Sequence, residues 1–291
     1  MTYKVGIELE VQGITVNEVK DSVEEIGCSF DGFSGYHGAG FSTRTGDTTN
    51  RAYDATGWRC ETDSSLGTNA SWNTKGGIEI ISRPLSGVAG IKEIKRLTKA
   101  LKRKGAYVDR RCGTHTTFGL DTNARFQRMS ANKKAEVGEE IMKTYYHFQD
   151  VIDAYNANNR QVNDHVGTST NNYCRSALSP VRESSVNMTK YIMFGIIEFR
   201  QLGYTLNGLK IEHWIRMINA IIASATNENH PSRNKSLYMQ PQTLQGMCDY
   251  LNVKSITESY WRNRIEEMAT KYTGGRQNRL RVLAINTEEV A

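Results

Sequence analysis

Acidic side chains recur at alternate positions along strand-like segments of this sequence. Glu8 and Glu10 stand two residues apart within residues 3–12, where apolar and polar residues alternate. Because successive side chains of a strand point to opposite faces, both carboxylates are predicted to share one face, about 6–7 Å apart. Two carboxylates at that distance repel unless a cation neutralises them, and Mg²⁺ binds carboxylate and phosphate oxygens. A metal site and an ordinary solvated strand face both account for this strand alone.

Three further segments carry ionisable groups in a similar way. Glu79 lies inside an apolar run, where an unpaired carboxylate is costly to bury, so a metal ion or an arginine is expected beside it. Glu61 and Asp63 form a second alternating acidic pair. Glu198 and Arg200 share one face of an apolar stretch, and the planar guanidinium suits phosphate or carboxylate. A buried structural ion pair is the alternative for this last pair.

A histidine completes the set. His115 lies in a threonine-rich segment, residues 112–120, where alternation places it on one face with Thr117. A lone histidine on a strand is often only hydrogen-bonded. However, several predicted strands each present ionisable groups on one face, and this combination favours a metal–phosphate site.

Strands and helices alternate irregularly around these residues. Period-two patterns predict strands at 3–12, within 58–84, at 112–120 and at 191–202, and helical periodicity predicts helices at 15–26, 88–104, 131–157, 208–226, 241–252 and 255–272. Thr15 is the expected cap of the first helix and Gly27 its stop. The predicted buried stripes are Val88, Ile91, Ile94, Leu97 and Leu101 in the second helix, and Val137, Ile141, Tyr145, Phe148, Ile152 and Tyr155 in the third.

Strands with one polar face favour an antiparallel or mixed sheet in an α+β fold. We expect one catalytic domain over residues 1–291, with a helical C-terminal cap at about 240–275. Residues 28–57, rich in glycine and polar side chains, predict a loop-rich insertion, and a strand pair interrupted by glycines is the alternative.

The composition is that of a globular protein. The 291 residues are 38% hydrophobic and 23% charged, which argues against disorder. No apolar run approaches the roughly 18 residues of a membrane span, so we expect a soluble, cytoplasmic protein with no membrane partner. Five cysteines without a C-x-x-C pair predict reduced thiols and offer little support for a zinc site or disulfides.

The positive charge is concentrated in two segments. Residues 92–111 hold nine Lys/Arg against Glu93 and Asp109, and residues 261–282 hold six against two acids, within a net charge of +6. Such segments can attract nucleic acid, nucleotide phosphates or an acidic substrate. A solvated helix face is the alternative.

Five motifs occur in a characteristic order over residues 3–222. They are Gly6-Ile7-Glu8-Leu9-Glu10, Asp63-Ser64-Ser65-Leu66, Gly77-Ile78-Glu79-Ile80-Ile81-Ser82-Arg83-Pro84-Leu85, Cys112-Gly113-Thr114-His115 and Ile197-Glu198-Phe199-Arg200-Gln201. The order resembles that of the amidoligase family in the glutamine synthetase/glutamate–cysteine ligase superfamily, and the chain is similar to members encoded by phages. Each motif alone is unspecific.

The resemblance implies a curved, mostly antiparallel sheet of the glutamine-synthetase catalytic type, with helices on its convex face and ATP with Mg²⁺ or Mn²⁺ on its concave face. The implied metal ligands are Glu8, Glu10, Glu79 and Glu198. Glu198, Arg200 and His115 would contact the bound nucleotide, with Arg200 also catalytic, and Glu61 or Asp63 would orient the metal or the amine. A looser match places Arg160, Arg175 and Asn187 on the substrate side. The family often has a second histidine where this chain has Thr117, so the resemblance does not extend to a two-histidine metal site.

The implied activity is formation of an amide or isopeptide bond between a carboxylate and an amine, small molecules or peptides, through an acyl phosphate. Three alternatives stay open on the same fold. They are a guanidino-kinase-like phosphotransferase, a non-catalytic binding or virion protein, and a ligase that modifies nucleic acid and docks through the basic 92–111 segment.

Overall fold

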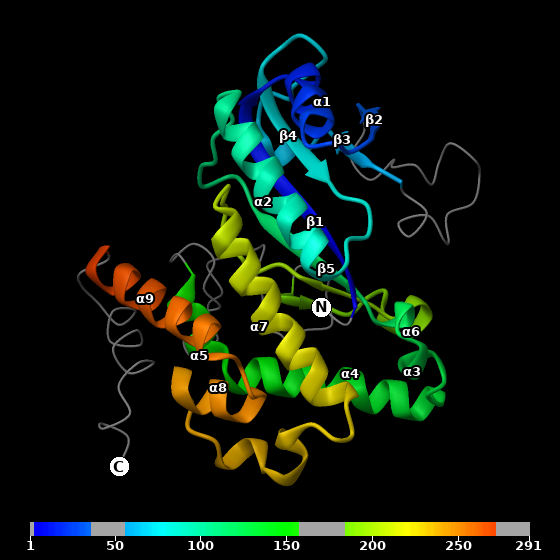
Figure 1. Ribbon diagram of the computed structural model, residues 1–291, viewed down its shortest axis with the longest axis vertical. Coiled ribbons are helices and arrows are strands. Elements are labelled where there is room, and N and C mark those ends of the chain that lie inside the picture. The colour runs from blue at the N-terminus through cyan, green and yellow to red at the C-terminus, as the bar shows by residue number, and fades with distance from the viewer. Residues whose placement is uncertain (1–2, 36–55, 157–183, 272–291) are drawn as a thin grey trace. The chain divides into compact units, whose positions relative to one another are not determined.

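The computed structural model describes residues 3–35, 56–156 and 184–271. It divides into two compact units, the first formed by residues 1–119 and 203–212 and the second by residues 120–202 and 213–291. Figure 1 labels helices and strands of the chain where there is room. The single catalytic domain expected from the sequence stays a prediction. Within the described ranges, no helix is long and apolar enough to cross a membrane.

The first unit contains five strands in the order β2-β3-β4-β1-β5. Their bounds are Lys4–Ile14 for β1, Phe30–Ser34 for β2, Trp58–Glu61 for β3, Gly76–Ile81 for β4 and Thr114–Gly119 for β5. β1 pairs with β4 and β5, and β3 pairs with β4, all antiparallel, while β2 runs parallel to β3. The mixed α/β architecture with mostly antiparallel pairing is therefore confirmed.

Two helices, α1 (Val16–Glu25) and α2 (Gly87–Arg103), belong to the same unit. α1 begins with a capping box, in which the Thr15 hydroxyl accepts from the Glu18 N–H and the Glu18 carboxylate accepts from the Thr15 N–H. Gly27, at φ +79°, follows its end. The predicted cap and stop are both confirmed.

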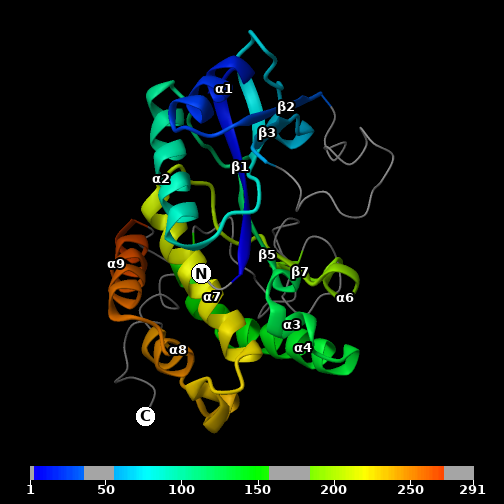
Figure 2. The same ribbon diagram turned by 45° about the vertical axis from the view of Figure 1, so that its right-hand side comes forward.

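Helix α2 packs on the apolar face of these strands. Trp58, fully buried on that face of β3, donates from its indole N–H to Glu93 of α2 at 2.8 Å. Both ribbon views place α2 alongside β1 (Figures 1 and 2). Four of the five predicted stripe residues of α2 are buried, but Val88 is 67% exposed because it lies in the first turn, beyond the core. That part of the predicted stripe was wrong.

The second unit is mainly helical. Its elements are α3 (Ala124–Gln127), α4 (Ala131–His147), α5 (Gln149–Tyr155), β6 (Val186–Asn187), α6 (Tyr191–Phe194), β7 (Ile196–Phe199), α8 (Leu244–Leu251) and α9 (Ser255–Lys271), and α7 (Gly208–Thr226) begins in the first unit and continues here. Four 3₁₀ turns, at Ser64–Leu66, Leu120–Thr122, Pro231–Asn234 and Leu237–Met239, complete the described elements. Stacked rings of Tyr155, Trp214 and Trp261 fill its core, with the Tyr155 and Trp261 centroids 4.0 Å apart.

Three sequence predictions need correction. The predicted helix 131–157 is two helices, because Phe148 leaves the helical conformation at ψ 19°, although all six stripe residues are buried. The predicted strand 191–202 begins as helix α6, which ends at Gly195 in the left-handed region (φ +62°). Residues 30–34 of the predicted loop-rich insertion form β2, as in the strand alternative, and residues 36–55 lie outside the described residues.

Candidate functional site

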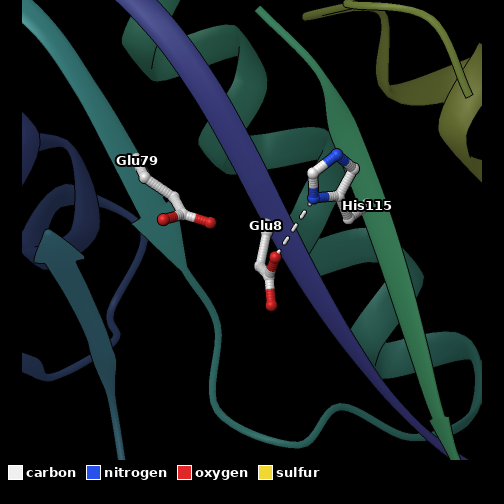
Figure 3. A group of neighbouring side chains, drawn as sticks. All are labelled: Glu8, Glu79 and His115. Atoms are coloured by element: carbon white, nitrogen blue, oxygen red, sulfur yellow. Dashed lines mark hydrogen bonds and ion pairs between the residues drawn. The ribbon is translucent and has the colours of Figure 1, made fainter. Parts of the chain in front are cut away.

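Three side chains on adjacent strands of the first unit converge on one point of the polar sheet face (Figure 3). Glu8 comes from β1, Glu79 from β4 and His115 from β5. One ligand atom from each residue lies within 4.8 Å of those of the other two. We call this group the acid–histidine cluster.

Strand register explains how the cluster forms. Glu8 lies directly across from His115, and Glu79 lies directly across from Glu10, so Glu79 reaches Glu8 on the diagonal. The His115 Nδ1 and the Glu8 Oε2 are 3.3 Å apart. His115 and Glu79 are buried, whereas Glu8 is half-buried with 30% of its side chain exposed. The cluster therefore meets solvent mainly at Glu8.

The donor set suits a small divalent cation. Ligands of Mg²⁺ lie about 2.1 Å from the ion, so adjacent ligands in an octahedron are about 3 Å apart and opposite ones about 4.2 Å apart. The cluster atoms, at most 4.8 Å apart, need only a modest contraction to reach that spacing. Two carboxylates select hard ions, and the imidazole is also tolerated by Mn²⁺.

Glu10 shares this face but contacts a different group. Its carboxylate accepts a hydrogen bond from the Gly113 N–H at 2.5 Å, and its own N–H donates to the Gly113 carbonyl at 3.2 Å. Glu10 thus ties β1 to the residue that precedes β5, and it is not among the three clustered residues. Its predicted role as a metal ligand stays a prediction.

The predicted pair Glu61 and Asp63 is not on one strand, because β3 ends at Glu61. Glu61 lies directly across from Glu79 and is buried, with the Arg59 Nε 3.2 Å from its Oε1. Asp63 caps the turn Ser64–Leu66 by accepting from the Ser65 N–H at 2.8 Å. Arg59 was not singled out from the sequence, although its two-residue spacing from Glu61 was a usable signal.

Described cysteines near the site are protonated at neutral pH. Burial raises the pKa of Cys112 to about 11 and raises that of Cys60 further. A protonated thiol is a poorer metal ligand and a weaker nucleophile than a thiolate. The four described cysteines, Cys28, Cys60, Cys112 and Cys248, form no disulfide with one another. The fifth, Cys174, lies outside the described residues.

A family model described as "Putative amidoligase enzyme" matches residues 1–194. The chain belongs to this amidoligase family. The matched range includes the whole acid–histidine cluster, together with Glu10, Glu61 and Asp63, and ends before Glu198. A comparison with curated proteins gives no match. Family membership indicates a ligase.

The second unit of this amidoligase holds the predicted pair Glu198 and Arg200. One oxygen of Glu198 pairs with the Arg200 Nη1, and the other accepts from the Asn187 amide of β6 at 2.7 Å. The Oδ1 of the Asn187 side chain in turn accepts from the Thr189 N–H and hydroxyl. Asn187 therefore helps to orient Glu198, and Glu198 orients Arg200. Among the three residues that the looser match places on the substrate side, Asn187 contacts Glu198. The other two, Arg160 and Arg175, lie outside the described residues.

Proposed function

We propose that this amidoligase forms an amide or isopeptide bond between a carboxylate and an amine, and that it depends on ATP and on Mg²⁺ or Mn²⁺. The acid–histidine cluster carries the proposal, because two carboxylates and an imidazole within 4.8 Å suit the cation that accompanies ATP. Family membership supports the ligase class. A sheet with helices on its apolar face and acids on the other supports the glutamine-synthetase type of fold.

The proposed reaction has two steps. A substrate carboxylate oxygen attacks the γ-phosphorus of ATP, giving an acyl phosphate and ADP. The amine nitrogen then attacks the acyl carbon, phosphate leaves with the bonding electrons, and the nitrogen loses a proton. Activation is needed because a carboxylate cannot expel hydroxide at neutral pH, whereas phosphate is a good leaving group.

In this proposal, Glu8, Glu79 and His115 hold the cation, which would screen the negative charge of the ATP phosphates. Glu61 is proposed to take the proton from the amine, with Asp63 as the alternative base. Of the two, Glu61 has the more suitable position, because it is buried and directly across from the cluster residue Glu79. For Glu198 and Arg200 of the second unit, contact with the nucleotide and metal binding by Glu198 stay predictions from the resemblance.

The test uses the full chain, ATP and Mg²⁺ with arrays of amino acids, peptides and amines, and measures ADP and phosphate release. Glu8→Gln and Glu79→Gln should each lower the rate at least about hundredfold, as is typical for removal of one group that stabilises transition-state charge. Glu24→Gln, at an exposed acid of α1 that pairs with Lys20, is the matched control. Calorimetric binding of ATP with Mn²⁺ provides a readout that does not depend on the substrates.

Two outcomes would contradict the proposal. If Glu8→Gln and Glu79→Gln bind ATP with Mn²⁺ as the unaltered protein does, the cluster is not the cation site. If ADP forms while phosphate stays bound to a guanidino product, the enzyme is a phosphotransferase rather than a ligase.

A further inference from the structure

Helix α2 carries an unusual concentration of positive charge. Six exposed basic residues lie between positions 92 and 103: Lys92, Lys95, Arg96, Lys99, Lys102 and Arg103. At 100° per residue they fall within an arc of about 120°. We call this group the basic stripe. The buried residues of α2 lie on the other side of the helix, and they are Ile91, Ile94, Leu97 and Leu101. That side packs in the core, whereas the basic stripe faces solvent.

Nearby acids neutralise only part of this charge. The Lys95 Nζ lies 2.8 Å from the Glu212 Oε2, and Arg103 pairs with Glu25. The other four members have no ion pair with any residue that the structure describes. They are Lys92, Arg96, Lys99 and Lys102.

The single acid of α2 does not face the basic stripe. The side chain of Glu93 points about 100° around the helix axis from that of Lys92. It contacts Arg83 and the Trp58 indole. Pairs such as Lys92 and Arg96, four residues apart, or Arg96 and Lys99, three apart, place like charges side by side, which destabilises a helix by a few tenths of a kcal/mol per pair. Solvated helix faces usually mix the two signs along i, i+4 positions, and this face does not.

We propose that the basic stripe binds the sugar–phosphate backbone of a nucleic acid, without reading its sequence. The row from Lys92 to Lys102 is about 15 Å long at 1.5 Å per residue. At 3.4 Å per phosphate, it extends along about four nucleotides of one strand of a duplex. Lysine and arginine on a helix fixed to the sheet are held in a row before binding. The proposal stands apart from the ligase proposal, since none of these residues belongs to the acid–histidine cluster.

An anionic membrane fits this face less well. Helices that lie in a membrane interface insert an apolar face between the lipids. The apolar side of α2 is already buried in the core, and Val88, in the first turn, is the exposed large apolar residue of this helix. The stripe offers charge without anything to insert, which matches a phosphate backbone.

Fluorescence anisotropy with a labelled duplex of about 20 base pairs tests the proposal between about 50 and 200 mM salt. We expect affinity to fall steeply with salt. The triple variant Lys92→Gln, Arg96→Gln and Lys99→Gln should weaken binding at least about tenfold at low salt. It should also reduce the slope of log K against log salt by about 2.7, since each lost phosphate contact accounts for about 0.9.

The matched control is Arg128→Gln, Lys190→Gln and Lys254→Gln, which removes three exposed charges from outside the basic stripe. It should leave the slope nearly unchanged. Equal weakening by both triples would show that net charge alone attracts DNA, and it would overturn the proposal. So would absence of binding at low salt, or binding only to phosphatidylserine vesicles. If the triple variant of the basic stripe releases ADP at the unaltered rate, the loss of DNA binding is independent of the proposed ligase activity.

Discussion

The two faces of strand β1 are built from alternate residues of one segment, yet they differ in almost every physical respect. On one face Val5, Ile7 and Leu9 are at most 1% exposed and pack in the core that α2 covers. On the other face Glu8 meets His115 and Glu79, with one atom of each within 4.8 Å of the others. The apolar face gains free energy by removing side chains from water. The polar face gathers like charges, which costs free energy.

This difference separates stability from chemistry within a single strand. Packing on the apolar face holds the backbone rigid, so the polar face can keep groups that repel one another at fixed positions. The two faces should therefore respond to substitution in opposite ways. A variant of the apolar face should lose stability, and a variant of the polar face should lose ligand binding with its stability intact.

The largest expected effect on stability belongs to the apolar face. Leu9→Ala should lower the free energy of unfolding by about 2–5 kcal/mol, because it removes buried methyl groups and leaves a cavity. Urea denaturation measures the change. Leu209→Ala, at a leucine that is 42% exposed, is the chemically matched control and should cost much less. Equal losses of unfolding free energy for the two variants would mean that Leu9 packs no more closely than a leucine on the surface.

An intermediate effect belongs to the polar face and requires the cation. Mn²⁺ at about a hundred times its dissociation constant should stabilise the unaltered protein by about 2.7 kcal/mol, since it binds the folded state. Glu79→Gln should abolish this increment and leave the stability without Mn²⁺ equal or slightly higher, because one repelling charge is removed. Thermal unfolding with and without Mn²⁺ measures both quantities. A large loss of stability in the metal-free variant would show that Glu79 belongs to the packing rather than to the cation site.

The smallest effect concerns α1 and pH. The Thr15 N–H that donates to the Glu18 carboxylate holds the pKa of Glu18 below its usual value, and Lys75 adds to the lowering. A carboxyl with a depressed pKa in the folded state stabilises the protein above its unfolded pKa and loses that contribution as pH falls through the folded value. Glu18→Gln should therefore cost less than about 1 kcal/mol at pH 7, and the difference from the unaltered protein should vanish in acid. A difference that persists at pH 2–3 would point to packing instead of charge.

Sequence periodicity predicted the helices and strands of this protein better than the contacts between neighbouring strands. The alternation over residues 3–12 placed Glu8 and Glu10 on one face, as β1 does. It could not distinguish their partners, because those depend on strands about 70 to 110 residues away. In the structure, Glu8 contacts His115, and Glu10 accepts a hydrogen bond from the Gly113 N–H. Strand register, which no local pattern encodes, decides which acid joins the cluster.

The remaining errors also have local causes. The apolar run after residue 190 predicts one strand, but Gly195 takes a left-handed conformation that separates helix α6 from strand β7. Glu61 and Asp63 alternate in sequence, but the strand ends between them and Asp63 turns to cap the next element. The core stripe predicted for residues 131–157 is buried in α4 and α5, because burial follows helical periodicity directly.

The cluster spans three strands that are remote in sequence, and this has a consequence for how the protein reaches its native state. Glu8 and His115 are 107 residues apart, and their side chains meet only after β1 has paired with β5. Contacts between such distant residues form slowly, because a long chain must first be brought together. A nascent chain that has made β1 and β4 but not β5 lacks the histidine donor. Cation binding should therefore appear late in refolding, and it would report completion of the sheet rather than its initiation.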